Sequence, residues 1–273
     1  MMCMRKLIAV DVDGTLVNSK GQITDKTRDA LIAATKAGHE VMIVSGRPTY
    51  GLRDQAKTLG FDKFGGVLSS YNGGQLYDYK EGKILANHTM DFDVAKRMLD
   101  FSKFLDLELM IPYGEVIITD YGDNFYTNRE SKMFNMDIKA VENIRDSLDF
   151  APNKLLFAQD PDKIDEPSMR LLDEFGDVTE QVKSTRFYYE VMPKGLSKGT
   201  SILEACKIFD IDREDTIVFG DEMNDMSMFE VAGTGVAMGN AVESIKNVAD
   251  YVTKTNNEDG IAYYLENFVL NKE

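Results

Sequence analysis

Short apolar runs alternate with amphipathic segments along the first quarter of the chain. The runs at 6–10 and 40–46 are typical of strands buried on both faces, and 66–73 predicts a third strand. The segments between them, 24–39 and 49–60, show helical spacing and predict helices. Strands that alternate with helices form parallel β-α units, so the pattern predicts an α/β fold with a Rossmann-like parallel sheet.

The pattern changes after Gly74. A hairpin is expected next, with its turn at Glu81 and Gly82, and the following segment mixes elements without regular alternation. In that segment helices are predicted near 92–106 and 166–175, and strands near 108–119, 154–160 and 185–192. Regular units return later, with predicted helices at 197–211, at 224–233 and from about 258, and predicted strands at 216–221 and 235–240. We therefore expect a discontinuous core, 1–84 and 190–273, interrupted by an inserted α+β domain at 85–189.

The charge balance restricts the classes of partner. The 273 residues include 46 acidic and 31 basic side chains, a net charge of −15, and no basic patch stands out along the sequence. Such a chain repels nucleic acid and anionic membranes, so neither is an expected partner. A site for a phosphorylated metabolite would need its own positive potential, supplied by a metal ion, a lysine or backbone amides.

The N-terminal segment and the cysteines point to a cytoplasmic protein. Only four apolar residues, Leu7–Val10, precede the first carboxylate, which is too short a run for a signal peptide or a membrane span. The two cysteines, Cys3 and Cys206, lack the spacing of a disulfide framework or a zinc site. We expect both to be reduced thiols.

Two acidic residues end the first predicted strand. In the run LIAVDVDGTL, the two-residue period of a strand places the side chains of Asp11 and Asp13 on the same side of its carboxyl end. Ligands bind at this edge of open α/β sheets. Clustered carboxylates repel each other unless a cation lies between them, and oxygen ligands favour Mg²⁺. A solvated turn is the alternative, because Asp and Gly are also ordinary turn residues.

Polar groups also follow the next two predicted strands. In VSGRP, the hydroxyl of Ser45 and the backbone amides of Ser45 and Gly46 can face an anion at a strand-to-helix turn. Asn72 falls at the end of the third strand. A plain turn before a proline is the alternative interpretation of VSGRP.

Two segments near the C-terminus carry further candidate ligands. Lys198 opens a predicted helix, where a cation opposes the helix dipole unless an anion faces it; a solvated surface lysine is the alternative. The strand 216–221 ends in Asp221, and Asn224 and Asp225 follow around the first turn of the next helix. These oxygen donors can complete a Mg²⁺ shell, or they can simply cap that helix.

Taken in order, these segments resemble the four motifs of the haloacid-dehalogenase superfamily of phosphohydrolases. The matches are DVDGT at 11–15, SG at 45–46, Lys198, and GDEMND at 220–225. The insertion between the second and third motifs is similar to the α/β cap domain of the Cof-type sugar-phosphate phosphatases, and residues 236–262 resemble the family's C-terminal segment. The family more often has threonine at the second motif, and Ser45 retains the hydroxyl.

The resemblance implies a Mg²⁺-dependent phosphatase that acts on small phosphorylated metabolites, with sugar phosphates as the favoured class. Asp11 would be the nucleophile that forms an aspartyl-phosphate, and Asp13 would protonate the leaving group and later activate water. The Mg²⁺ ligands would be Asp11, the backbone carbonyl of Asp13, and Asp221, with Asp225 in support. The phosphoryl oxygens would be held by the Val12 amide, Ser45, Gly46, Lys198 and Asn224.

Two other functions are compatible with the sequence. A phosphomutase of the same superfamily would share the core and differ in holding a bisphosphate intermediate. A phosphate-binding regulatory protein would keep the fold without turnover, although binding alone needs no general acid such as Asp13. The sequence does not identify the substrate, and within the insertion Tyr113, Tyr126 and Tyr188 are candidates for contacts with the leaving group.

Overall fold

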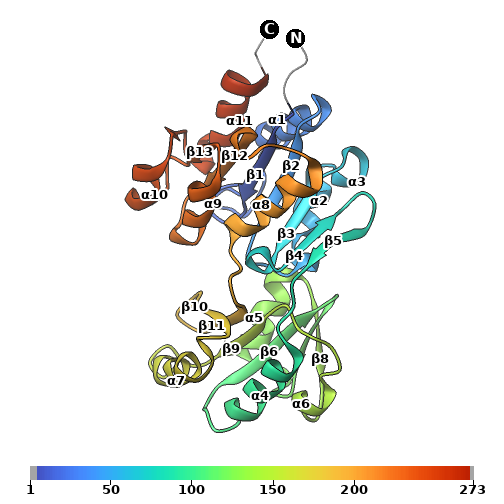
Figure 1. Ribbon diagram of the computed structural model, residues 1–273, viewed down its shortest axis with the longest axis vertical. Helices are drawn as coiled ribbons and strands as arrows, with labels where there is room; N and C mark the ends of the chain where they lie inside the picture. The colour runs from blue at the N-terminus through green and yellow to red at the C-terminus, as the bar shows by residue number, and fades with distance from the viewer. Residues whose placement is uncertain (1–4, 271–273) are drawn as a thin grey trace. The chain divides into compact units, whose positions relative to one another are not determined.

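The computed structural model of the chain describes residues 5–270, which form two compact units (Figure 1). The first unit contains the chain up to Gly46, Leu52–Ala86, and the chain from Ser197 onward. The second unit contains Arg47–Gly51 and Asn87–Leu196. Each unit has its own sheet and its own hydrophobic core.

The first unit is built on an eight-stranded sheet with the strand order β14-β13-β12-β1-β2-β3-β4-β5. Every pair from β14 to β3 is parallel, whereas β4 pairs antiparallel with β3. The strands are β1 (Leu7–Asp11), β2 (Glu40–Val44), β3 (Val67–Ser70), β4 (Gln75–Asp78), β5 (Lys83–Asn87), β12 (Thr216–Gly220), β13 (Thr234–Ala237) and β14 (Tyr251–Val252). This sheet confirms the predicted α/β core, and it brings the carboxyl ends of β1, β2 and β12 to one edge.

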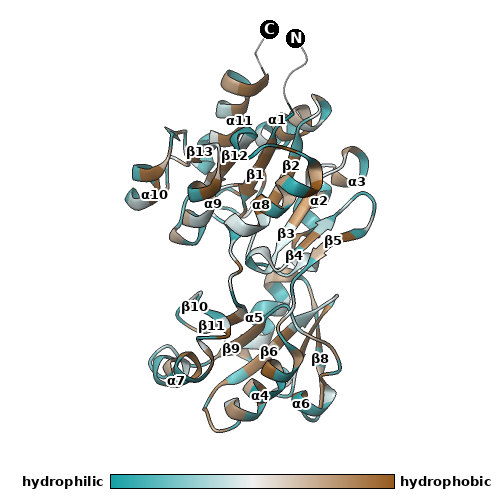
Figure 2. Ribbon diagram, viewed as in Figure 1, coloured by the Kyte–Doolittle hydropathy of each residue, from teal (hydrophilic) through white to brown (hydrophobic). Residues whose placement is uncertain are grey.

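Helices cover both faces of this sheet. Ile8 and Val10 of β1 pack in the hydrophobic core that includes α1 and α11, whereas Leu7 and Ala9 pack in the core that includes α8 and α9. The helices are α1 (Asp25–Lys36), α2 (Arg53–Thr58), α3 (Phe61–Phe64), α8 (Lys198–Phe209), α9 (Met226–Val231), α10 (Glu243–Val248) and α11 (Gly260–Leu265). Because both faces are buried, the central strands β1 and β12 are mainly apolar, as their brown colour in Figure 2 shows.

The predicted elements of the first unit are present with small shifts at their ends. Thr24 caps α1 by accepting a hydrogen bond from the amide of Thr27 at 3.2 Å. The segment 49–60 forms a 3₁₀ turn, Thr49–Leu52, followed by α2, instead of a single helix. The sequence pattern gives no indication of α10, because Ile245 is the only buried residue in it.

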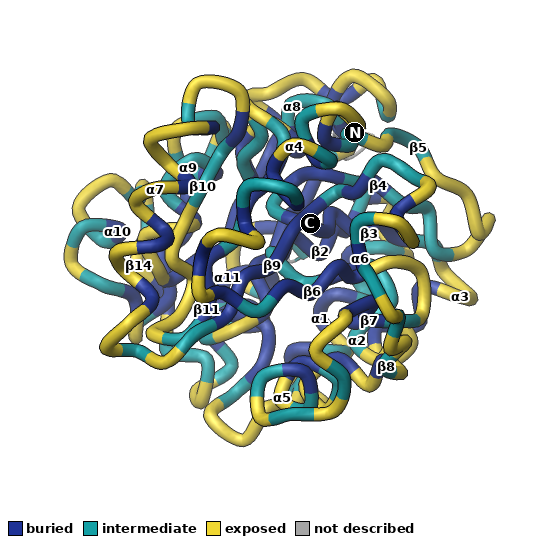
Figure 3. The backbone as a smooth tube through the Cα atoms, turned by 90° about the horizontal axis from the view of Figure 1, so that it is seen from below, coloured by how far each residue is buried: buried dark blue, intermediate teal, exposed yellow. Residues whose placement is uncertain are grey.

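The second unit is built on a six-stranded sheet with the strand order β10-β11-β9-β6-β7-β8. All pairs are antiparallel except β7 with β8. The strands are β6 (Glu108–Tyr113), β7 (Val116–Thr119), β8 (Asp137–Ala140), β9 (Leu155–Ala158), β10 (Thr179–Lys183) and β11 (Tyr188–Pro193). Helices α4 (Phe92–Ser102), α6 (Ile144–Ser147) and α7 (Asp165–Phe175) pack on one face, and α5 (Phe125–Phe134) packs on the other. In Figure 3 the strands β6 and β9 are buried, whereas α5 carries exposed residues.

Parts of the second unit differ from the sequence prediction. The pattern indicates no element between 120 and 153, yet α5, β8 and α6 form there. Helix α5 is hard to detect because its buried face includes Thr127 and Glu130 instead of an unbroken apolar stripe. The edge strand β10 is also missed, and β11 pairs with β9 and β10 as far as Pro193, so the unit extends beyond the expected end at 189.

Two further features of the described residues bear on the sequence prediction. Among residues 5–270, no helix combines the length and the apolar character needed to cross a membrane. Cys206 is a buried free thiol in α8, while Cys3 lies outside the described residues.

Charged side chains are buried between α5 and the sheet of the second unit. Glu130 is only 6% exposed. Close to it, Lys154 pairs with Glu190 at 3.2 Å from Nζ to Oε2, and the Tyr188 hydroxyl donates to the carbonyl of Tyr126 at 3.1 Å. Burial raises the pKa of Glu130 to about 7, although Lys154 opposes this effect. The carboxylate of Glu190 reinforces the shift by repulsion.

This pKa predicts how Glu130→Gln changes the pH dependence of stability. Between the ordinary pKa of 4.5 and about 7, the unfolded chain loses the Glu130 proton while the folded chain keeps it, so this residue makes stability fall as pH rises. The stability of the glutamine variant does not fall in this way, because glutamine does not titrate. Its free energy of unfolding relative to wild type should therefore rise by about 1–3 kcal/mol between pH 5 and pH 8, measured by urea unfolding.

The matched control is Glu115→Gln, since Glu115 is exposed in the same unit. Its free energy of unfolding relative to wild type should be independent of pH over the same interval. Equal behaviour of the two variants would contradict the assigned pKa of Glu130.

Candidate active site

Asp11 is the last residue of β1 and lies among buried groups. Its side chain is at the carboxyl edge of the sheet, opposite Val44 of β2 in the strand register, and the residue is 5% exposed. A carboxylate in such a position requires compensation by a cation or by hydrogen bonds. The ammonium of Lys198 supplies it, since Nζ lies 2.6 Å from Asp11 Oδ1.

Lys198 is the first residue of α8 and is 2% exposed. The helix begins with a capping box between Ser197 and Thr200, and Gly199 allows it to approach α9 closely, because a Cβ at this glycine would lie 2.1 Å from the carbonyl oxygen of Ser227. From this position Lys198 also donates to Asp225 Oδ1 at 2.6 Å. The lysine is therefore a buried bridge between two carboxylates, not a solvated surface residue.

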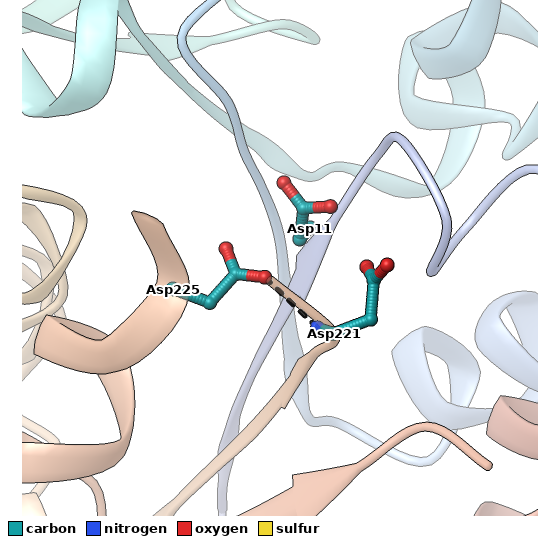
Figure 4. Close-up of side chains that lie close together, drawn as sticks. All are labelled: Asp11, Asp221 and Asp225. Atoms are coloured by element: carbon teal, nitrogen blue, oxygen red, sulfur yellow. Dashed lines mark hydrogen bonds between the residues drawn. The ribbon is translucent and has the colours of Figure 1, made fainter. Parts of the chain in front are cut away.

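Asp225 connects this lysine to the loop after β12. Its Oδ2 accepts from the backbone amide of Asp221 at 2.9 Å (Figure 4). The same oxygen accepts from the amide of Glu222 at 3.1 Å, and Oδ1 accepts from Lys198. Gly220 leaves room for this arrangement, because a Cβ there would lie 2.8 Å from the Cβ of Asp225. Both carboxylate oxygens of Asp225 thus already accept hydrogen bonds from the protein.

Asp221 is held in place by Gly14 and Thr15, which belong to the turn that follows β1. The hydroxyl of Thr15 donates to Asp221 Oδ1 at 2.6 Å. Gly14 has a φ of +87°, and a Cβ at this position would lie 2.1 Å from Asp221 Oδ2. Any larger residue would displace this carboxylate, so the glycine of the DGT sequence is required both by its backbone conformation and by the space beside it.

Three carboxylates converge at this edge of the first unit. Asp11, Asp221 and Asp225 each offer an oxygen, and these oxygens lie within 4.8 Å of one another (Figure 4). Burial raises the pKa of Asp11 to about 7, an effect that Lys198 opposes and Asp225 reinforces. Burial likewise raises the pKa of Asp221 to about 6, opposed by its hydrogen bond with Thr15. Burial alone would lower the pKa of Lys198, but attraction by the two carboxylates outweighs it and the pKa is raised.

Asp13 does not join the carboxylate cluster. The strand ends at Asp11, and the backbone then turns, with the amides of Leu16 and Val17 donating to the carbonyls of Asp11 at 3.1 Å and Val12 at 3.0 Å. Asp13 is exposed in this turn, and the side chain of Val12 is buried in the core. The strand stops before Asp13, so the two-residue period of a strand does not apply to it, and its part in the site stays a prediction.

Ser45 and Gly46 follow β2 beside the turn that contains Asn72. The amide of Ser45 donates to the carbonyl of Ser69 at 2.9 Å, and its carbonyl accepts from the amide of Asn72 at 3.0 Å. Strand pairing thus continues one residue beyond β2, and the expectation that the Ser45 amide faces an anion is wrong. A Cβ at Gly46 would lie 3.0 Å from Asn72 Oδ1, so these two residues are close neighbours at the edge.

The remaining candidates lie in different surroundings. Asn224 is exposed in the turn between Asp221 and Asp225. In the second unit, Tyr113 is exposed and stacks on Phe150, with ring centroids 3.8 Å apart. Tyr188 is buried beneath α5 and donates to a backbone carbonyl, so it does not fit the expectation of a surface contact for a leaving group.

Two supporting residues were not identified as such from the sequence. Thr15 orients Asp221, and the side-chain amide (Nδ2) of Asn240 donates to the carbonyl of Gly14 at 2.8 Å. Thr15 is visible in the DGT sequence, but its partner is far away along the chain. Nothing in the local sequence around Asn240 identifies the carbonyl that it contacts.

Comparisons with known proteins identify the family. A family model of haloacid dehalogenase-like hydrolases matches residues 8–265. The chain belongs to the haloacid dehalogenase-like hydrolases. The family and the hydrolase class inferred from the four motifs are thus confirmed.

Related proteins align with nearly the whole of this chain. The protein M6_Spy0533 of Streptococcus pyogenes serotype M6 is 33% identical over 269 residues, which is 97% of this chain and 99% of the relative. The phosphatase YwpJ of Bacillus subtilis is 31% identical over 297 residues, covering 97% of this chain and 100% of the relative. YwtE of the same organism, a 5-amino-6-(5-phospho-D-ribitylamino)uracil phosphatase, is 29% identical and covers 96% of this chain and 97% of the relative.

Solved structures share the fold. A haloacid dehalogenase-like hydrolase from Bacteroides thetaiotaomicron has a TM-score of 0.91 and 32% identity, with 96% of this chain and 98% of that chain covered. BT4131, described as a subclass IIB sugar phosphatase, has a TM-score of 0.78 and 24% identity, with 97% and 99% covered, and supports the fold alone.

The bridging role of Lys198 leads to a stability prediction. Lys198→Met leaves two buried carboxylates without their cation, and removal of one partner of a buried ion pair costs about 3–5 kcal/mol. We expect a loss of this size in urea unfolding at neutral pH with a chelator present. Lys207→Met, an exposed position on the same helix, is the matched control and should cost less than about 1 kcal/mol. Equal losses for both variants would contradict the bridging role.

Proposed function

We propose that this hydrolase is a Mg²⁺-dependent phosphatase that acts on small phosphorylated metabolites, with sugar phosphates as the favoured class, through an aspartyl-phosphate on Asp11. The observation that carries the proposal is the position of Asp11. It lies at the carboxyl end of β1, in contact with a buried ammonium and within reach of two further carboxylates. A nucleophilic carboxylate needs this combination of orientation and nearby positive charge.

The donor set fits Mg²⁺. Asp11, Asp221 and Asp225 offer carboxylate oxygens that lie within 4.8 Å of one another, and hard oxygen donors are the ligands that this ion prefers. In the proposal, Asp11, Asp221 and the backbone carbonyl of Asp13 hold the ion, and Asp225 supports it. When bound, Mg²⁺ neutralises charge on the phosphoryl group and on the carboxylates around it.

The two aspartates of the first motif divide the chemistry. An oxygen of Asp11 attacks phosphorus in line, and the bond from phosphorus to the leaving oxygen breaks while Asp13 donates a proton to that oxygen. Asp13 then accepts a proton from water, which attacks phosphorus and releases inorganic phosphate and Asp11. Asp13 is exposed in the turn that follows Asp11, and the proton that it gives to the leaving oxygen in the first step is replaced by the proton that it takes from water in the second.

The phosphoryl oxygens need donors around the nucleophile. We assign this role to the ammonium of Lys198, the hydroxyl of Ser45, and the backbone amides of Gly46 and Val12, with Asn224 at the rim. Lys198 is the best supported of these, since it already contacts Asp11.

The two units have separate roles in this proposal. The first unit carries every residue assigned to the chemistry and would be the catalytic core. The second unit, Arg47–Gly51 and Asn87–Leu196, would be the cap that selects the substrate. The activity of YwtE on a phosphorylated ribityl compound supports a small phosphorylated metabolite as the substrate class of this chain.

Asp11→Asn tests the proposal directly. The amide is a poor nucleophile, so hydrolysis of p-nitrophenyl phosphate with Mg²⁺ should fall on the order of 10³-fold or more, while the variant remains folded. Inorganic phosphate release is measured, with and without Mg²⁺, because release distinguishes hydrolysis from a phosphomutase reaction. Asp173→Asn, an exposed position in the second unit, is the control and should retain wild-type turnover. Activity of Asp11→Asn within tenfold of wild type would rule out Asp11 as the nucleophile.

Asp13→Asn should separate proton transfer from metal binding. If the side chain moves protons and only the backbone carbonyl binds the ion, kcat should fall by about 10²–10⁴-fold while Mg²⁺ affinity stays near that of wild type. Asp221→Asn should instead weaken Mg²⁺ binding, as measured by calorimetry. Equal loss of Mg²⁺ affinity in both variants would contradict this division.

A further inference from the structure

One face of α5 carries two cations that form no ion pair among the described residues. Arg129 and Lys132 are both exposed, and neither lies within salt-bridge distance of a carboxylate in the described part of the chain. The nearby carboxylate of Asp123 accepts a hydrogen bond from Asn128 instead.

These cations line a groove of about 560 Å³ together with Phe125, Asn128 and Met133. The spacing of three and four residues places all five on one side of the helix. Sites for small molecules have volumes of about 300–1,000 Å³ and combine apolar walls with a few polar groups, and this groove meets both conditions.

The apolar wall of the groove is exposed to solvent. Phe125 is 61% exposed and Met133 is 49% exposed. The ring of Phe125 packs against the ring of Phe187, with centroids 5.6 Å apart, and the guanidinium of Arg129 lies 5.9 Å from the centroid of Phe187. The aromatic ring and the cation are thus held side by side before any ligand binds.

The helix that carries the groove is fixed to the sheet. The Tyr188 hydroxyl of β11 donates to the carbonyl of Tyr126 at 3.1 Å, and a capping box between Asn124 and Thr127 begins the helix. Glu130 points to the buried side, where burial raises its pKa to about 7. Its carboxylate lies on the buried side of the helix and does not line the groove.

We propose that this groove is a binding site for a small organic anion in which a phosphate, phosphonate or carboxylate group adjoins a planar ring. Arg129 and Lys132 bind the anionic group, and Phe125 and Met133 cover the ring. All the residues that line this site belong to the second unit, and none of them is assigned to the chemistry at Asp11.

Methyl NMR of methionine reports on this site directly. The probe is phenylphosphonate, which combines a ring with an anion and has no ester bond to hydrolyse. Three exposed methionines serve as reporters: Met133 in the groove, Met169 on α7 and Met223 beside Asn224. We expect a saturable shift of the Met133 methyl signal and no shift of Met169. Methylphosphonate, which lacks the ring, should bind at least about tenfold more weakly at Met133.

Matched charge variants locate the anion. Lys132→Gln should weaken phenylphosphonate binding at Met133 by about tenfold, whereas Lys139→Gln, an exposed lysine of the same unit, should change it less than about twofold. The Met133 signal in ligand-free Lys132→Gln confirms that the groove is intact. No shift at Met133, a shift confined to Met223, or equal affinities in the two variants would overturn the proposal. Equal binding of methylphosphonate and phenylphosphonate would overturn the role of the ring.

Discussion

The candidate site depends on one buried ammonium. Lys198 donates to Asp11 and to Asp225, both at 2.6 Å, in a place where three carboxylates gather. Without a cation, such a cluster would carry both the cost of burial and the mutual repulsion of its members. The first turn of α8 brings the ammonium there at the expense of an unfavourable interaction with the helix dipole, which the two carboxylates offset.

The parallel sheet explains why distant segments meet at this ammonium. β1 lies between β2 and β12, so the residues that follow all three strands emerge at one edge. Glycines then permit contacts that side chains would prevent: Gly14 beside Asp221, and Gly199 beside the backbone of α9. The strand order therefore brings the site residues to the same edge of the sheet. The close backbone contacts at the glycines then determine the exact positions of their side chains.

The sequence predicts those parts of the molecule in which local pattern and tertiary environment agree. Buried strands such as β1 and β12 are continuous apolar runs, and the site residues follow them directly. Helix α5 is missed because Glu130 and Thr127 occupy its buried face, where Thr127 bonds to the preceding loop and Lys154 offsets part of the burial cost of Glu130. The turn after Asp11 could not be predicted either, since its course depends on contacts of Gly14 with Asp221 and Asn240.

Asp221 and Asp225 differ in their hydrogen bonds, and this difference gives them different roles at the carboxyl edge of the sheet. Asp225 uses one oxygen for Lys198 and the other for two backbone amides, so its carboxylate is fixed in position and fixes the lysine and the loop in turn. Asp221 receives one side-chain hydrogen bond, from Thr15, and its other oxygen faces the space beside Gly14. A cation that approaches this cluster therefore finds in Asp221 an oriented ligand and in Asp225 a rigid support. The hydrogen bonds of Asp225 thus fix the loop from which Asp221 presents its carboxylate.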